Sequence, residues 1–187
     1  MSKSEAGYSI QQHKHLYASW CAARAYGRGL RGGGNKTAFA LIEACGLRAI
    51  TGPNDIGQDV DAWLLGYMRK ILAEAKRKGI ASFTFGHAQK LVNIYLKTVL
   101  VCGGHHEHPL VAKLHPPLDF VLLNGLSVHL RENRQANEKA AVAFSEAQDA
   151  NAKWTAFSEA DYVAHIDAIK LLMGPRPLYL VEEFWNL

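Results

Sequence analysis

Apolar residues recur every three or four positions along most of this chain, and no segment alternates clearly between polar and apolar residues. The clearest stripe lies between positions 54 and 78 and consists of Ile56, Val60, Trp63, Leu64, Tyr67, Ile71 and Leu72. A spacing of three to four residues places side chains on one face of an α-helix. The pattern therefore predicts an all-α fold, a compact single-domain globule of several helices.

Capping residues, glycines and prolines indicate where the helices begin and end. We expect helices at about 9–26, 37–48, 54–78, 85–102, 118–126, 127–150, 158–173 and 177–185. Thr84, Ser127 and Ser158 are placed to cap three of them, and Asn54 or Asp55 to cap another. Because neither a repeat nor a long linker divides the chain, we expect one domain over residues 1–187.

Two glycine-containing loops interrupt the helical pattern, at 27–36 and at 103–116. The first has five glycines within eight residues, which predicts a flexible connection. It also carries three cations, Arg28, Arg31 and Lys36. It departs from a phosphate-binding loop because Asn35 occupies a position that requires glycine, and because a helix precedes it instead of a strand.

Composition and charge limit the surroundings of the chain. Its three cysteines, Cys21, Cys45 and Cys102, are widely scattered, which is typical of reduced thiols. The sequence shows no apolar signal segment and no apolar run of about 20 residues, so we expect a cytoplasmic protein without a membrane partner. A net charge of +4 and a pI of about 9.0 are compatible with a nucleic-acid partner.

The histidine-rich loop at 103–116 is one candidate for chemistry. His105, His106 and His115 have side chains that bind zinc, which a metal-dependent hydrolase would use. However, successive histidines in a loop cannot all converge on one ion, and no helical His-x-x-x-His pair fixes two ligands. Histidines exposed to solvent are the simpler interpretation, so we expect no metal or other cofactor and keep the hydrolase as an alternative.

A second candidate centres on Lys90 and Asp119. Lys90, Asn93 and Lys97 share one face of the helix predicted at 85–102, where most lysines simply face water. Asp119 follows two prolines and is expected in the first turn of the next helix, where free amides and the helix dipole favour a carboxylate. It either stabilises that helix start or provides an anionic group beside a cleft.

The residues Ala88-Gln89-Lys90, Asn93 and Tyr95-Leu96-Lys97, followed by His115-Pro116-Pro117-x-Asp119, resemble the core of a family of uncharacterised bacterial proteins. The segment 17–25 is also similar to that family. More distantly, the central block resembles the helix-hairpin-helix DNA glycosylases, and among these the archaeal 8-oxoguanine DNA glycosylases. The Leu-Pro-Gly-Val-Gly-type hairpin of those enzymes is replaced here by Gly103-Gly104 and the histidine-rich loop.

The resemblance implies an enzyme that excises a modified or damaged base from DNA, with or without cleavage of the strand. Lys90 is the implied nucleophile, Lys97 a competing one, and Asp119, 29 positions after Lys90, the assisting carboxylate. The implied nucleic-acid contacts are Arg28, Arg31, Lys36, Lys76, Arg77, Lys78 and Asn93. A non-catalytic module that binds nucleic acid or protein on the same scaffold is the alternative. The catalytic hypothesis requires the Lys90 amine within about 5 Å of the Asp119 carboxylate at an open cleft.

Overall fold

Helices account for the regular structure in the computed structural model, which describes residues 7–27 and 30–185. No strand occurs among these residues, so the predicted all-α fold is confirmed. The α-helices are α1 (Ile10–Ala25), α2 (Asn35–Cys45), α3 (Val60–Arg77), α4 (Phe85–Leu96), α5 (Phe120–Glu132), α6 (Glu138–Ala150) and α7 (Glu159–Met173). The shorter helical segments are η1 (Leu47–Ala49), η2 (Pro53–Asp55), η3 (Lys97–His105), η4 (Val111–Lys113), η5 (Trp154–Ala156) and η6 (Leu178–Phe184).

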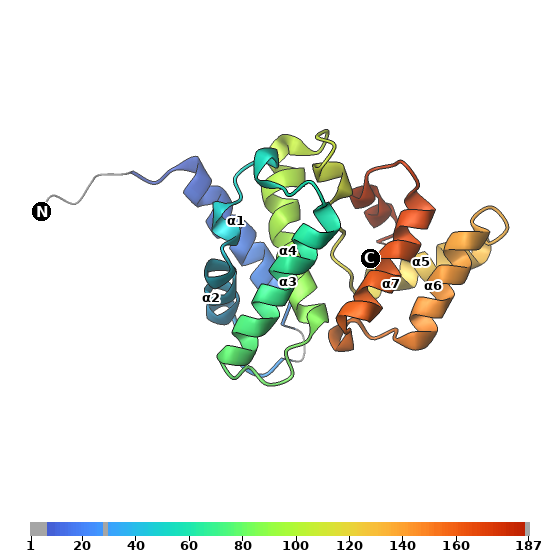
Figure 1. Cartoon of the computed structure of the whole chain (residues 1–187), viewed down its shortest axis with the longest axis horizontal. Coiled ribbons are helices and arrows are strands. Elements are labelled where there is room, and N and C mark those ends of the chain that lie inside the picture. Colours follow the sequence, from blue (N-terminus) through green and yellow to red (C-terminus); the bar gives the residue numbers. More distant parts are fainter. Residues whose placement is uncertain (1–6, 28–29, 186–187) are drawn as a thin grey trace, which may run out of the picture.

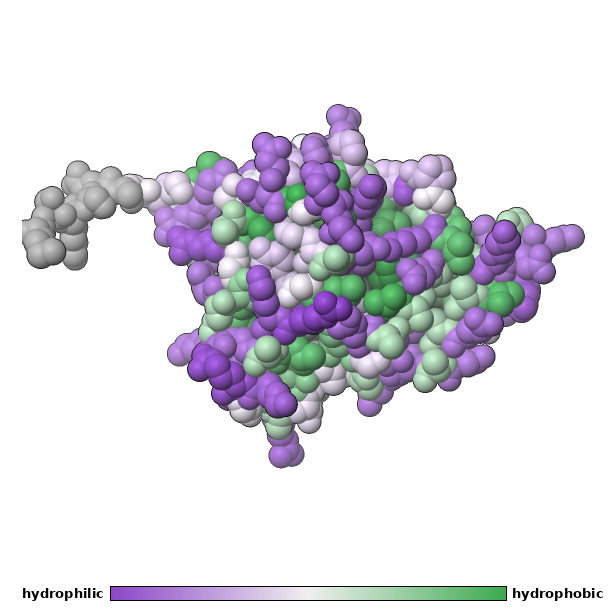
Figure 2. Space-filling model, in the orientation of Figure 1, coloured by the Kyte–Doolittle hydropathy of each residue, from purple (hydrophilic) through white to green (hydrophobic). Residues whose placement is uncertain are grey.

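The helices form two groups that share one core (Figure 1). Helices α1 to α4 pack together as an N-terminal half, whereas α5, α6, α7 and η6 form a C-terminal half. Helix α4 contacts α7 and η5, and thereby connects the halves. Buried apolar side chains continue from one half to the other without a break, which confirms a single compact unit. On the face drawn in Figure 2, hydrophobic residues gather mainly towards the middle, between hydrophilic rims.

Side-chain caps explain where several helices begin. Thr84 and Ser158 cap α4 and α7 as predicted, each through a hydrogen bond from a backbone N–H three residues later. Asn54 and Asp55 lie in η2, so neither caps the next helix. Asp59 caps α3 instead, because its carboxylate accepts a hydrogen bond from the Ala62 N–H at 3.0 Å.

The predicted boundary at Ser127 is wrong. Ser127 lies inside α5, whose apolar face continues to Leu130. The chain turns later, between residues 133 and 137, where the backbone N–H and the side-chain amide of Asn133 both donate to the His129 carbonyl, at 2.9 Å and 3.0 Å. The helical segments predicted at 118–126 and 127–150 are therefore α5 and α6.

The region after α4 also differs from its prediction. The helix predicted to end near residue 102 continues as the π-helical segment η3, and Gly104 has a φ of 93°, a conformation that suits glycine. The loop predicted at 103–116 thus begins inside η3 and also contains η4. At the other glycine-rich loop, α2 begins at Asn35, and Arg28 lies outside the described residues. No helix in the described part of the chain is both long and apolar enough to cross a membrane.

Candidate active site around Lys90 and Asp119

The Lys90 amine and the Asp119 carboxylate meet where the middle of α4 faces the start of α5. Lys90 Nζ donates to Asp119 Oδ2 at 3.0 Å. The side chain of Lys90 is 5% exposed and that of Asp119 is 19% exposed. Asp119 is the N-cap residue of α5, since its other oxygen accepts a hydrogen bond from the Leu122 N–H at 2.9 Å. One carboxylate therefore both starts a helix and holds a buried amine, at a separation within the 5 Å that the sequence hypothesis requires.

Lys90 and Asp119 lie in the walls of two adjoining cavities. The larger cavity has a volume of about 510 Å³ and is also lined by Arg24, Phe120 and Trp154. The smaller one has a volume of about 280 Å³ and is lined by further residues that include Ile94, Lys97, Pro117, Glu182 and Trp185. Exposed wall residues such as Arg24, Phe120 and Trp185 show that both cavities reach solvent. A molecule that enters either cavity can therefore approach the amine.

Burial and charge act in opposite directions on Lys90. Loss of hydration lowers the pKa of the Lys90 ammonium below that of an ordinary lysine, although the nearby Asp119 carboxylate favours the charged form. The Trp154 ring lies 5.7 Å from Nζ and covers the amine on the side of the larger cavity. The net effect is an amine that releases its proton more readily than a lysine on the surface does.

Lys97, the competing nucleophile, lies in the smaller cavity, where its amine forms an ion pair with Glu182 Oε2. Its side chain is 32% exposed, far more than that of Lys90. Within the described part of the chain, the other oxygen of Glu182 is buried without a hydrogen-bond partner. The wall of the smaller cavity therefore combines apolar side chains with the Lys97–Glu182 ion pair, and the unpaired Glu182 oxygen is closed off from solvent.

Two buried amides on α4 hold the segment that leads to Asp119. Gln89 donates to the Leu118 carbonyl at 2.7 Å and accepts from the Leu118 N–H at 3.1 Å. Asn93 donates to the Pro116 carbonyl at 3.1 Å. Because Gln89 precedes Lys90 and Leu118 precedes Asp119, these bonds fix the carboxylate relative to the amine. Sequence reasoning missed this role of Gln89, although two amides four residues apart, Gln89 and Asn93, on one face of a helix were a visible signal.

The prediction that Asn93 contacts nucleic acid is corrected by its position. Asn93 is only 2% exposed, and its amide also lies 3.0 Å from the hydroxyl of the buried Tyr162. Asn93 occurs one helical turn after Gln89 and therefore shares its inner face instead of the cavity wall. We assign it to positioning of the 116–118 segment.

The described cations with an implied role in DNA binding are Arg31, Lys36, Lys76, Arg77 and Lys78, and all are exposed. None of these five lines either cavity that contains Lys90. Arg77 and Lys78 form ion pairs with Glu74, and Arg28 lies outside the described residues. Contacts of these residues with DNA stay a prediction. Arg24, which sequence reasoning did not select, lies with Lys90 in the wall of the larger cavity and adds a second cation there.

The histidine-based metal site is not assembled. His115 is buried, with Nδ1 2.8 Å from the Tyr162 hydroxyl and Nε2 2.9 Å from Asp61 Oδ1. Both ring nitrogens are thus engaged away from His105 and His106. Among residues 7–27 and 30–185, no three or more His, Cys, Asp or Glu side chains are grouped so that they could hold a metal ion. The ligand set of the hydrolase alternative is therefore wrong.

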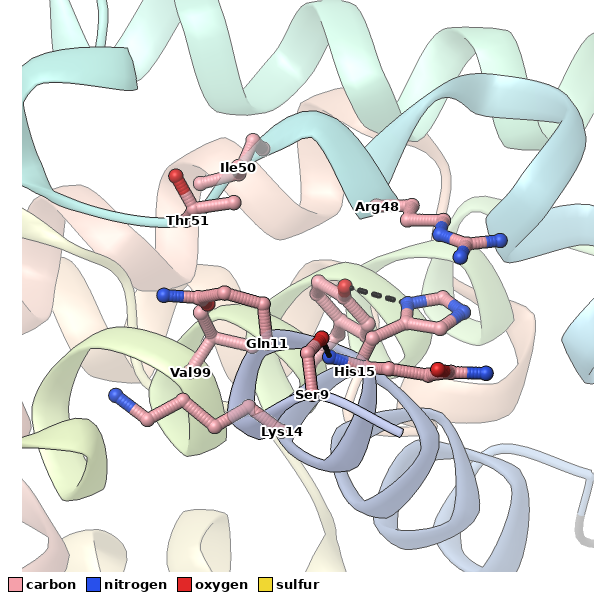
Figure 3. A pocket seen from close by; sticks show the side chains of 10 residues that line it. Ser9, Gln11, Lys14, His15, Arg48, Ile50, Thr51 and Val99 are labelled. Carbon is pink, nitrogen blue, oxygen red and sulfur yellow. Dashed lines mark hydrogen bonds between the residues drawn. The ribbon is translucent and has the colours of Figure 1, made fainter. Parts of the chain in front are cut away.

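A separate cavity of about 270 Å³ lies at the start of α1 (Figure 3). His15 Nδ1 lies 2.8 Å from the Tyr95 hydroxyl, and His15 Nε2 lies 2.7 Å from Glu43 Oε1. Two cations, Lys14 and Arg48, contribute to the wall. Figure 3 shows them pointing towards opposite sides instead of converging, so this cavity is not a preformed anion site.

No family model matches this chain, and comparison with curated proteins and with solved structures gives no significant match. The resemblance to helix-hairpin-helix DNA glycosylases therefore stays a prediction. What can be concluded about function comes from the placement of Lys90, Asp119 and the two cavities.

Replacing Gln89 by methionine is expected to lower the free energy of unfolding by about 2 kcal/mol. Methionine has nearly the same length, but it leaves the buried N–H and carbonyl of Leu118 without partners, and each unpaired group carries a desolvation penalty. Urea unfolding measures the change. Gln135→Met, at an exposed position, is the matched control and should change stability by less than about 0.5 kcal/mol. Equal stability of the two variants would contradict the positioning role of Gln89.

Proposed function

We propose that this protein is a DNA glycosylase that excises a modified or damaged base, with Lys90 as the nucleophile and Asp119 as the assisting carboxylate. The observation that carries the proposal is the 3.0 Å contact between the Lys90 amine and the Asp119 carboxylate in the shared wall of two cavities. A buried amine with a lowered pKa is a competent nucleophile, because its neutral form is accessible nearer to neutral pH.

The chemistry uses the two groups in succession. The neutral amine of Lys90 attacks C1′ of the target nucleotide, and the bond between C1′ and the base breaks. The base leaves with the electron pair of that bond and takes up a proton. The negative charge of Asp119 stabilises the positive charge that develops on the sugar. The adduct opens to a Schiff base, which is either hydrolysed by water or undergoes β-elimination that cuts the strand.

The cavities on the two sides of the amine suit the two parts of a nucleotide. A base must leave its stack before such an enzyme can act on it. In the smaller cavity, Ile94, Pro117 and Trp185 offer apolar and aromatic surface to a flat base, and the charged side chains of the wall offer polar partners to its edge. The larger cavity, with Arg24 in its wall, suits the sugar and phosphate.

Borohydride trapping tests this proposal. The protein is incubated with oligonucleotides that carry 8-oxoguanine, uracil or an abasic site, and borohydride reduces any Schiff base to a stable secondary amine. A covalent protein–DNA adduct on one of these substrates is expected. Tight binding of all three without an adduct or a released base would instead support the non-catalytic module.

The rate of base release is expected to rise with pH and to level off below the pH at which an ordinary lysine, with a pKa of 10.5, titrates. The rise follows the neutral fraction of Lys90, whose pKa is lowered by burial. In Asp119→Asn the rising limb should move to still lower pH, because the carboxylate that favours the ammonium is gone. The maximal rate should fall at the same time, since the charge on the sugar is no longer stabilised. Single-turnover rates over a pH series measure both effects. A rising limb at the same pH in Asp119→Asn as in the wild type would contradict the electrostatic coupling of Asp119 to Lys90.

A further inference from the structure

Helix α1 presents an exposed row of planar side chains, Tyr17, Trp20 and Arg24, which we call the α1 ladder. The Tyr17 and Trp20 rings are 6.0 Å apart with planes inclined by 23°, and the Arg24 guanidinium carbon lies 5.8 Å from the centre of the Trp20 ring. Tyr17 is 55% and Trp20 48% exposed. Leaving two aromatic rings half open to water forgoes the stabilisation that their burial would give.

The ladder runs beside the two cavities. Arg24 contributes to the wall of the larger cavity, and Cys21, next to Trp20 in the helix, contributes to the wall of the smaller one. Phe120, which is 65% exposed, lies in the wall of the larger cavity as the first residue of α5. Exposed aromatic rings therefore occur both at the mouth of the Lys90 site and along the helix that borders it.

The sequence segment that carries the ladder has only positive charges, although the cavity walls that it borders also contain Asp119 and Glu182. Between Glu5 and Glu43 the sequence contains no Asp or Glu. The described part of this stretch carries Lys14, Arg24, Arg31 and Lys36. Positive charge beside exposed rings complements a chain that has both anionic phosphates and flat bases.

We propose that the α1 ladder is a stacking platform for unpaired bases, so that the protein engages single-stranded DNA in preference to intact duplex. Stacking on a side chain requires an open base face, and in a duplex those faces are covered by the neighbouring base pairs. Contacts to phosphates stabilise binding of both single-stranded and duplex DNA, so the preference for the single strand comes from stacking on the rings. The identity of the nucleotide beside Lys90 rests on the proposed function, whereas the strand preference rests on the ladder.

The test is a binding comparison with Lys90→Gln, which retains the ladder but lacks the nucleophile. A labelled single strand of mixed sequence and the same strand annealed to its complement are titrated at one fixed salt concentration, with fluorescence anisotropy as the readout. The single strand is expected to bind more tightly. Tyr17→Ala and Trp20→Ala should each weaken single-strand binding about tenfold and leave duplex binding unchanged. Both side chains are exposed, so the variants should fold, which circular dichroism checks.

Leu171→Ala is the matched control, since Leu171 is 54% exposed on α7 and outside the ladder. Equal affinity for single strand and duplex, or ladder variants that behave like this control, would overturn the proposal. A stable dimer of the free protein in which Trp20 fluorescence is shielded would overturn it as well. Ladder-dependent binding, together with no trapped adduct when the protein that retains Lys90 is treated with borohydride, supports the platform and removes the glycosylase. An adduct that forms equally on duplex and on single strand, and that Trp20→Ala does not affect, supports the glycosylase and removes the platform.

Discussion

Replacing Lys90 by glutamine is expected to abolish the borohydride-trapped adduct and to leave oligonucleotide binding largely intact. The adduct forms through the neutral amine, and the amide of glutamine is not a nucleophile under these conditions. Asp119 keeps its hydrogen bond from the Leu122 N–H in this variant, so the N-cap of α5 is retained. Gel separation of the reduced reaction products measures the adduct, and thermal unfolding confirms that the variant is folded.

Two further lysine variants serve as controls for Lys90→Gln. Lys97→Gln tests the competing nucleophile, and its adduct should persist because this variant keeps the buried Lys90 amine, whereas the Lys97 side chain is 32% exposed. Lys139→Gln, at an exposed position on α6, controls for the loss of one positive charge. Loss of the adduct in Lys97→Gln together with its persistence in Lys90→Gln would move the nucleophile to Lys97 and reject the assignment made here.

Some of the features that position Lys90 and Asp119 are visible in the sequence. Thr84 fixes the start of α4, and the two prolines before Asp119 force an extended approach to α5. What cannot be seen in the sequence is the direction in which α4 turns its polar residues. The predicted face of Lys90, Asn93 and Lys97 was expected to meet solvent or DNA, whereas the structure buries Lys90 and Asn93 and leaves Lys97 partly exposed.

Long-range packing decides the remaining differences. Asn93 is buried because the 116–118 segment offers it a carbonyl, and that segment is remote in sequence. Ser127 does not start a helix because Asp119 has already started one that the core continues. His115 does not face His105 because Tyr162 and Asp61, each far from it in the chain, take its two nitrogens. Local propensity predicts where helices form, whereas contacts between residues that are distant in sequence decide which face of each helix is buried.

Replacing Gly86 by alanine is expected to lower the free energy of unfolding by about 3 kcal/mol and to reduce activity at the Lys90 site. A Cβ at residue 86 would lie 1.7 Å from the Trp154 carbonyl oxygen, so the backbone of η5 has to move. Displacing packed backbone costs more than the roughly 1 kcal/mol that alanine gains over glycine in a helix. The same movement shifts the Trp154 ring, which lines the larger cavity and lies 5.7 Å from the Lys90 amine.

Gly66→Ala on α3 separates steric conflict from helix propensity. A Cβ at residue 66 would meet nothing within 4 Å, so this variant should be more stable than the wild type by about 0.5–1 kcal/mol. Urea unfolding of the two variants should therefore give changes of opposite sign, and only Gly86→Ala should alter the quenching of Trp154 fluorescence. Stabilisation by both substitutions would mean that η5 does not pack on the start of α4. Trp154 would then not form part of the wall of the larger cavity.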